Sequence, residues 1–174
     1  MSAPRGAGNA TGKVTNIVFA GLGGQGVIKA SDILADAALR VGLDVKKAEV
    51  HGMSQRGGSV TSDVRFGQRV LSPMVPRGEA DYLVVLAPSE VEVTRAMLRP
   101  GGVLLAPGLI SDADLPNKRS LNVALLGALS QYIDLPTEAL LDAIRAALPK
   151  RLHEVNEKAF ALGRNLAARQ GRII

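Results

Sequence analysis

Apolar and polar positions alternate along this chain in short blocks whose spacing predicts strands and helices in turn. A β-branched run at 16–20 is followed at once by glycines, and residues 27–41 then carry apolar side chains at helical spacing. Segments 44–50 and 59–67 have the patterns of strands, and the continuous apolar run 80–88 is typical of a strand buried on both faces. These blocks predict alternating strands and helices in the first half of the chain.

The second half of the sequence is mainly helical. Segment 89–102 predicts a helix with Ser89 as its N-cap, and 103–110 predicts another buried strand. An additional strand, either a hairpin partner of the strand at 59–67 or a short edge strand, is expected at 68–75. Three more helices are predicted, at 120–133, 137–148 and 151–169.

The order of these elements indicates an α/β fold: a single Rossmann-like domain with a largely parallel sheet flanked by helices and a helical C-terminal third. We expect residues 1–14 to form a flexible N-terminal tail and residues 15–174 to form one domain. A length of 174 residues, with 47% hydrophobic and 21% charged residues, suits one globular domain.

The composition excludes several classes of site and protein. The chain has no cysteine, which rules out disulfides, thiolate zinc sites, iron–sulfur ligation and a cysteine nucleophile within it. No segment approaches the roughly 18 continuous apolar residues of a membrane helix. We therefore expect a cytoplasmic protein that does not bind a membrane.

The net charge of +5 comes entirely from the C-terminal stretch. Residues 1–144 carry 14 basic and 14 acidic side chains, whereas residues 145–174 carry seven basic and two acidic ones. A nucleic-acid-binding surface usually pairs such charge with stacking aromatics, and Phe160 is the only aromatic residue there. We expect no nucleic acid partner. A solvated helix face, or a seat for an acidic partner or a phosphate group, explains the charge better than a free-standing binding module does.

The segment GLGGQG at 21–26 satisfies G-x-G-x-x-G through Gly21, Gly23 and Gly26, between a predicted strand and a predicted helix. Glycines allow a tight turn and the close approach of a ligand, and free N–H groups at a helix start favour an anion. On these residues alone, two interpretations stand: a tight strand–helix turn, or a phosphate-binding turn.

A free-standing NAD- or FAD-binding Rossmann protein is the alternative that this motif raises. Such a domain needs an acidic residue about 20 positions further on, at the end of the second strand. Lys46 and Lys47 occupy that neighbourhood and fit a ribose contact badly. Glu49 has the right chemistry, but it lies beside a second glycine loop that a standard NAD domain lacks.

The second glycine loop, HGMSQRGGSV at 51–60, makes the pattern specific. FAGLGGQGV, an amphipathic helix and then HGMSQRGGSVTSDVRFG together resemble the gamma subunit or domain of 2-oxoacid:ferredoxin oxidoreductases. Within that family the chain is most similar to the small beta subunit of the indolepyruvate enzymes. The resemblance continues in SPMVPRGEADYLVVLAPSEV, NVALLGALS and EVNEKAFALG, and so covers nearly all of 16–163. The chain departs from the family at 108–120, where longer members carry an extra strand and helix.

This resemblance implies oxidative decarboxylation of a 2-oxoacid, of the indolepyruvate or arylpyruvate class, to an acyl-coenzyme A. In such enzymes thiamine diphosphate, Mg²⁺ and 4Fe-4S clusters perform the chemistry, and ferredoxin accepts the electrons. The chain has no cysteine for clusters and no recognisable thiamine diphosphate motif. We expect it to bind no cofactor tightly, to be inactive alone, and to complement a larger subunit that carries thiamine diphosphate and the clusters, with ferredoxin reached through the complex.

The two glycine loops are expected at one edge of the sheet, outside the carboxyl ends of the strands. There they would form a cradle for the diphosphate of coenzyme A, a role that the family's gamma domain implies. The residues predicted to bind it are Gly23, Gly24, Gln25, Gly26, Ser54, Gln55 and Arg56.

Other polar residues have weaker claims to a role. His51 is the one candidate for proton transfer, although a structural or interface role is favoured. His153 is expected at the surface, and Asn156 in a buried hydrogen bond between helix and loop. Lys46 and Lys47 are expected to be solvated charges at a strand end. No metal site is expected.

Overall fold

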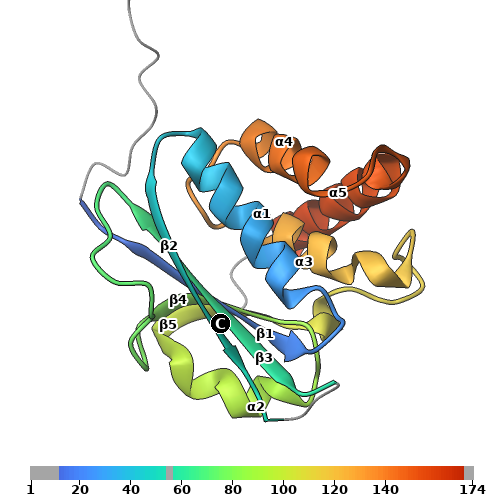
Figure 1. Ribbon diagram of the computed structural model, residues 1–174. Coiled ribbons are helices and arrows are strands. Elements are labelled where there is room, and N and C mark those ends of the chain that lie inside the picture. The colour runs from blue at the N-terminus through green and yellow to red at the C-terminus, as the bar shows by residue number, and fades with distance from the viewer. Residues whose placement is uncertain (1–11, 54–56, 171–174) are drawn as a thin grey trace, which may run out of the picture.

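Five strands form one sheet in the order β2-β3-β1-β4-β5 in the computed structural model, which describes residues 12–53 and 57–170 (Figure 1). β1 pairs in parallel with β4, and β4 with β5, whereas β3 runs antiparallel to both β1 and β2. β3 is therefore the one strand of reversed direction, and the prediction of a largely parallel sheet is confirmed. The strands are β1 (Thr15–Leu22), β2 (Asp44–His51), β3 (Ser59–Gly67), β4 (Ala80–Val85) and β5 (Leu98–Leu105). The predicted tail at 1–14 falls mostly outside the described residues.

Of the α-helices in the described residues, four cover one face of the sheet and a short one lies on the other (Figure 1). The first group is α1 (Val27–Arg40), α3 (Leu121–Leu129), α4 (Thr137–Ala147) and α5 (His153–Gln170), and the short helix is α2 (Glu90–Thr94). The large core lies under the four helices, and a small cluster around Val18 and Leu83 lies under α2. None of the helices in the described ranges has the length and apolar character needed to cross a membrane.

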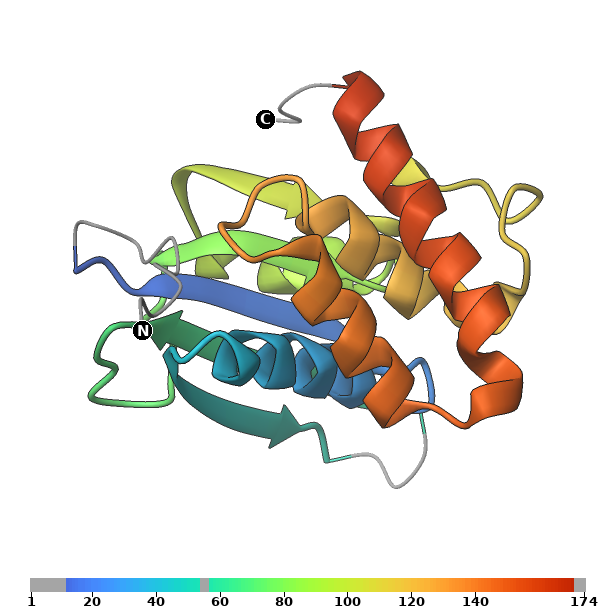
Figure 2. The ribbon, with the colours of Figure 1, turned by 90° about the horizontal axis from the view of Figure 1, so that it is seen from above.

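α3 is apolar on all sides because it lies between the sheet and α5. Its residues 122–129 are all buried. α5 crosses it closely at two glycines: a Cβ on Gly127 would overlap the Phe160 carbonyl oxygen, and one on Gly163 would overlap that of Ala124. This crossing fixes the start of α5 near the start of α3, at the end of the molecule where β1 turns into α1 (Figure 2).

The strand predicted at 68–75 does not form. Its backbone groups bond to side chains of neighbouring strands instead: Val70 N–H donates to Asp44 Oδ2 (2.7 Å) and Val75 N–H to Asp63 Oδ2 (2.9 Å). Arg65 Nη1 donates to the Ser72 carbonyl oxygen (2.9 Å). Proline at 73 and 76 removes further backbone donors, so the segment lies along the sheet as an anchored irregular chain.

The helix predicted at 89–102 is also shorter than expected. α2 ends at Thr94, a 3₁₀ turn occupies Arg95–Met97, and the chain enters β5 at Leu98. Ser89 is the N-cap residue, but its side chain makes no capping bond. The strand predicted at 103–110 accordingly begins earlier and ends at Leu105.

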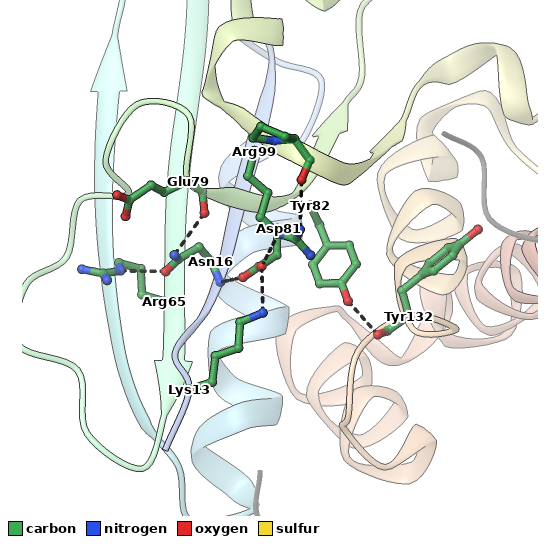
Figure 3. Close-up of polar contacts among 9 residues, drawn as sticks. Lys13, Asn16, Arg65, Glu79, Asp81, Tyr82, Arg99 and Tyr132 are labelled. Carbon is green, nitrogen blue, oxygen red and sulfur yellow. Dashed lines mark hydrogen bonds and ion pairs between the residues drawn. The ribbon is translucent and has the colours of Figure 1, made fainter. Parts of the chain in front are cut away.

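A polar network closes the edge of the sheet where β1 and β4 begin (Figure 3). The buried Asp81 accepts from Asn16 N–H (2.9 Å) and Arg99 Nε (2.7 Å) and pairs with Lys13 Nζ (3.3 Å). Arg65 Nε donates to Asn16 Oδ1 (2.9 Å). The chain thus ties β1, β3, β4 and β5 together at this edge and leaves the opposite, carboxyl edge to its glycine loops.

Candidate functional site

The two glycine loops meet at the carboxyl edge of the sheet, as expected from the sequence. Leu22, the last residue of β1, lies opposite Ser59, the first residue of β3. Gly23 N–H donates to the Gly58 carbonyl oxygen (2.9 Å), and Gly52 N–H to that of Ser59 (2.7 Å). The loop after β1 and the loop between β2 and β3 are therefore joined by the same hydrogen-bonded sheet edge.

The glycines of the first loop are required for a left-handed backbone, for packing against Asn122, and for a close approach of strand and helix. Gly24 (φ +88°) and Gly26 (φ +83°) adopt the left-handed region. A Cβ on Gly24 would meet open space, whereas one on Gly26 would overlap Asn122 Nδ2 and lie 3.0 Å from Asn122 Cγ. Gly21 makes the close strand–helix approach, because a Cβ there would lie 2.8 Å from Val27 Cγ2. Gly24 alone has room in front of it.

Gln25 braces this turn. Its Oε1 accepts from Leu22 N–H (2.7 Å), its Nε2 donates to the Leu86 carbonyl oxygen (3.4 Å), and its own N–H donates to the Leu22 carbonyl oxygen (3.2 Å). Within the described part of the chain, the N–H groups of Gly24 and Gly26 have no such partner. Gln25 therefore holds the turn in shape, and Gly24 and Gly26 offer the free donors.

Two cavities flank the turn, and Gly24 and Gly26 line both. The α1 cavity, about 380 Å³, is bounded by the first turn of α1, including Ile28 and Lys29, and by His51. The central cavity, about 530 Å³, is bounded by the residues leading into α3: Lys118, Arg119, Leu121 and Asn122. Both volumes suit a small ligand.

The cations of these cavities carry uncompensated charge. Lys29, Lys118 and Arg119 are exposed and have no acidic partner among the residues that the structure describes. Asn117 Oδ1 accepts from Arg119 N–H (2.9 Å), which fixes the backbone of this turn. Because like charges gather around free backbone N–H groups, the site favours an anion such as a phosphate. Sequence reasoning missed Lys118 and Arg119, which are about 95 residues from the glycines.

Ser54, Gln55 and Arg56 lie outside the described residues, so their part in the cradle stays a prediction. His51 lines the α1 cavity with 62% of its side chain exposed, and its Nε2 lies 3.6 Å from Glu49 Oε2. In the described ranges its ring makes no bond to a backbone carbonyl of the kind that a loop-closing residue would make.

The two lysines of β2 differ from one another. Lys46 Nζ is 3.6 Å from Asp44 Oδ1, and 40% of its side chain is exposed, which agrees with a solvated charge. Lys47 has a side chain only 19% exposed and pairs with Asp32 of α1 and with Glu49 (3.3 Å). The prediction of a solvated charge is wrong for Lys47, because the side chain points to the face that α1 covers and links β2 to that helix.

Asn156 makes the buried hydrogen bond predicted for it, since its Nδ2 donates to the Leu152 carbonyl oxygen (2.9 Å) in the turn before α5. His153 is only partly exposed, and its Nε2 lies 2.8 Å from the Leu148 carbonyl oxygen. These contacts give both residues a structural part at the start of α5.

Part of the basic charge of the C-terminal helices is neutralised within the chain. Arg145 Nε contacts Glu157 (2.7 Å) and its Nη1 contacts Asp142 (3.1 Å), and the hydrogen bond to Glu157 is the main cause that raises the pKa of Arg145. Lys158 pairs with Glu154 (2.7 Å). These pairs support the interpretation of this stretch as a solvated helix face.

Neither a metal site nor ligands for an iron–sulfur cluster are found among the residues that the structure describes. The described part of the chain has no group of three or more His, Cys, Asp or Glu side chains placed to hold a metal, and the sequence has no cysteine. The chemistry that the carboxyl edge supports is the binding of a phosphate-containing ligand.

Comparison with known proteins identifies relatives over most of the chain. The family described as pyruvate ferredoxin/flavodoxin oxidoreductase matches residues 16–116 and 108–166. Indolepyruvate oxidoreductase subunit IorB of Thermococcus kodakarensis is 35% identical over 191 residues, which cover 87% of this chain and 95% of that relative. The pyruvate/ketoisovalerate oxidoreductases common subunit gamma of the same organism is 31% identical over 170 residues, with 82% and 91% covered. The crystal structure of a keto/oxoacid ferredoxin oxidoreductase gamma subunit from Geobacter sulfurreducens is similar at 28% identity and a TM-score of 0.77, covering 89% of this chain and 99% of that chain.

The match to IorB also bears on the segment before α3. The alignment with IorB extends over 191 residues, more than the 174 residues of this chain, so IorB contains residues that this chain lacks. The family match is divided into two segments that overlap at 108–116, within the connection expected to be short at 108–120.

Proposed function

Because this chain belongs to the pyruvate ferredoxin/flavodoxin oxidoreductase family and is a gamma-type subunit of a 2-oxoacid oxidoreductase, we propose that it helps to bind coenzyme A in a thiamine-diphosphate-dependent enzyme. In this proposal a larger subunit carries thiamine diphosphate, Mg²⁺ and the iron–sulfur clusters, because this chain has no cysteine and its described residues include no group of metal ligands. This chain completes the complex and supplies the edge on which coenzyme A lies.

The reaction balances as follows. The 2-oxoacid loses its carboxylate as carbon dioxide, its acyl carbon forms a thioester with coenzyme A, and the thiol proton is released. The two electrons set free pass one at a time to two oxidised ferredoxins. This chain takes part in the second of these events, because it holds the thiol-bearing substrate.

The observation that carries the proposal is the glycine turn between two cavities with uncompensated cations. Coenzyme A contains a diphosphate between its nucleoside and its pantetheine arm. We place this diphosphate in the central cavity, where the N–H groups of Gly24 and Gly26 and the side chains of Lys118 and Arg119 can donate to its oxygens. The α1 cavity, with Leu22, Ile28 and Val60 in its wall, suits the less polar pantetheine arm.

The strand order speaks against the NAD- or FAD-binding alternative. In dinucleotide-binding Rossmann folds the second strand lies beside the first, so its terminal carboxylate reaches the ribose. Here β3 lies between β1 and β2, which moves Glu49 one strand further away. The Glu49 carboxylate is also engaged with Lys47 and His51.

For the 2-oxoacid we propose the indolepyruvate or arylpyruvate class. The IorB relative is more similar to this chain, and over a longer alignment, than the gamma subunit shared by the pyruvate and ketoisovalerate enzymes. A panel of aryl, branched and short 2-oxoacids given to the native complex tests this assignment, and preference for pyruvate would contradict it.

The test of the coenzyme A site uses Lys118→Met in the complex assembled with the large subunit. The Lys118 side chain is exposed and makes no hydrogen bond or ion pair with the residues that the structure describes, so the fold should be unaffected. The apparent KM for coenzyme A should rise about tenfold, because a charge-assisted bond to the ligand is lost. Arg69→Met, which removes an equal charge from the segment between β3 and β4, is the matched control and should behave like the wild type. Equal coenzyme A dependence of Lys118→Met and the wild type would contradict the proposed site.

A further inference from the structure

β2 is the outer strand of the sheet, and one of its edges is unpaired (Figure 2). All eight of its residues lie opposite residues of β3 in an uninterrupted register. Gly52 N–H continues this ladder by donating to the Ser59 carbonyl oxygen (2.7 Å), and bonded residues alternate along an antiparallel strand. The backbone groups of Lys47 and Glu49 therefore point away from β3. Among the residues that the structure describes, these groups have no other backbone partner.

The features that usually protect an exposed strand edge are weak in β2. The strand is eight residues long and has no proline and no bulge in its pairing with β3. Lysine side chains often guard such an edge, but Lys47 turns onto the helical face, where it pairs with Asp32 of α1 and with Glu49 (3.3 Å). Its charge is therefore compensated. An edge of this kind can pair with the strand of another chain.

Exposed apolar side chains gather at both ends of this strand. Seven large apolar residues are exposed in the part of the chain that the structure describes, and five of them belong to β2 or adjoin it. They are Leu39 and Val41 at the end of α1, Leu71 in the segment anchored to Asp44, and Val50 and Met53 at the end of β2. Such a concentration beside an open edge indicates a surface that another chain covers.

The charges of β2 fit a second copy of the same strand. Two copies related by a twofold axis run antiparallel, and residues that face each other point to the same side of the joined sheet. With Lys47 on the axis two lysines would face each other, and with Glu49 on the axis two glutamates would. With Ala48 on the axis, Lys47 of each copy faces Glu49 of the other. Because opposite charges across strands stabilise a pair and like charges destabilise it, the register centred on Ala48 is favoured.

We propose that two copies of this chain pair through their β2 edges, antiparallel and centred on Ala48, to form one continuous sheet from the five strands of each copy. The outward backbone groups of Lys47 in one copy bond to those of Glu49 in the other, and the twofold axis repeats this pair. Two small alanine side chains meet on the axis itself. The dimer does not depend on the proposed binding of coenzyme A.

The same register brings the exposed apolar side chains of the two copies together. The antiparallel arrangement places the end of β2 in one copy beside the start of β2 in the other. Val50 and Met53 of one copy therefore lie near Leu39 and Val41 of its partner. The dimer interface thus has opposite charges at its centre and apolar contacts on both flanks.

The oligomeric state of the full chain tests this dimer. Sedimentation equilibrium should show a particle of two 18.2 kDa chains for the purified protein and at least two copies of the chain in its complex with the large subunit. Glu49→Lys places lysines opposite each other on both sides of the axis and should raise the dissociation constant of the dimer at least about tenfold. Glu154→Lys is the matched control, because it makes the same charge reversal beside a lysine, Lys158, on α5. It should leave the dimer unchanged.

A mixture of two variants checks that the charges act across the axis. Lys47→Glu places glutamates opposite each other and should also weaken the dimer. An equimolar mixture of Lys47→Glu and Glu49→Lys should associate again, because each lysine then faces a glutamate of the other chain. Thermal melts show whether each variant is folded.

Amide hydrogen exchange gives a second measurement of the same edge. The N–H groups at positions 47 and 49 should exchange slowly in the wild-type dimer and fast in Glu49→Lys, because only the dimer gives them partners. A monomeric wild type, a dimer that Glu49→Lys leaves intact, or a mixture of folded variants that does not associate would overturn the proposal. Slow exchange at these positions only in the presence of the large subunit would assign the edge to that subunit and would overturn it as well.

Discussion

At the scale of single residues, the glycine turn separates positions that shape the protein from positions that face a ligand. Gly21 and Gly26 are in contact with Val27 and Asn122, and Gln25 bonds both to the turn and to the end of β4. Gly24 is the position with open space in front of its Cα. The sequence motif does not distinguish these positions, because the spacing of the glycines does not show which of them contacts other residues of the protein.

We expect Gly26→Ala and Gly24→Ala to have different effects. Both substitutions strain a left-handed backbone by about 1 kcal/mol, but Gly26→Ala also collides with Asn122 and should lower the free energy of unfolding by about 2 kcal/mol or more. Gly24→Ala should lose only the strain energy and weaken coenzyme A binding severalfold, since its methyl group enters the cavities. Thermal melts and coenzyme A titrations of both variants check this. Normal coenzyme A binding by a folded Gly24→Ala would assign the turn to architecture alone.

At the scale of elements, the sequence predicts most of the fold well. The predicted strand at 59–67 matches β3, and the predicted helices at 27–41 and 137–148 match α1 and α4 within one residue, because their apolar periodicity is strong. The strand expected at 68–75 does not form because the carboxylates of Asp44 in β2 and Asp63 in β3 accept hydrogen bonds from its N–H groups, which the local pattern does not indicate. Lys118 and Arg119 reach the glycine turn through the position of α3, which no local pattern encodes.

The two carboxylates that anchor segment 68–79 should have opposite effects on the pH dependence of stability. Burial raises the pKa of Asp63 above 3.8, although Val75 N–H and Arg65 oppose the shift. The folded state then binds more protons than the unfolded state just above pH 3.8, so this group's contribution to stability falls as pH rises, by at most about 1.4 kcal/mol per pH unit. Asp63→Asn should therefore gain stability relative to the wild type from pH 4 upward, measured by urea unfolding at a series of pH values.

Asp44→Asn provides the comparison for that series. The hydrogen bond from Val70 N–H is the main cause that lowers the pKa of Asp44 below 3.8, so its stabilising contribution is present above that pH and is lost as pH falls below it. The free energy of unfolding of the wild type should therefore exceed that of Asp44→Asn above pH 3.8, and the difference should shrink as the pH falls below that value. Parallel pH profiles for the two variants would contradict both assignments.

The packing of α3 against α5 gives a second prediction at this scale. Gly163→Ala should lower the free energy of unfolding by about 2 kcal/mol or more, because its methyl group overlaps the Ala124 carbonyl oxygen and backbone atoms cannot move aside easily. Gly108→Ala, which meets nothing within 4 Å and has no positive φ, is the control and should be nearly neutral. Urea unfolding of both variants measures the difference. Equal stability of the two would mean that the helices cross less closely than described.

At the scale of the whole molecule, the two edges of the sheet have separate tasks. The Asp81 network links the beginnings of β1 and β4 to Arg99 of β5, whereas the opposite edge carries the glycine turn, its adjoining cavities and cations that have no acidic partner among the described residues. The proposed function therefore assigns ligand binding to one edge, while the other holds structural polar contacts.

The isolated subunit is expected to have no catalytic activity of its own. Because the chain has no cysteine and its described residues include no metal-binding group, the purified protein should be colourless and should reduce no ferredoxin with any 2-oxoacid. Adding the large subunit should restore 2-oxoacid-dependent reduction, and omission of coenzyme A should suppress acyl transfer. A complex assembled with Gly163→Ala, assayed below the melting temperature of that variant, shows whether lower stability of this subunit alone reduces activity. Turnover by the purified chain alone would show that it carries a reactive centre of its own and would contradict the proposed function.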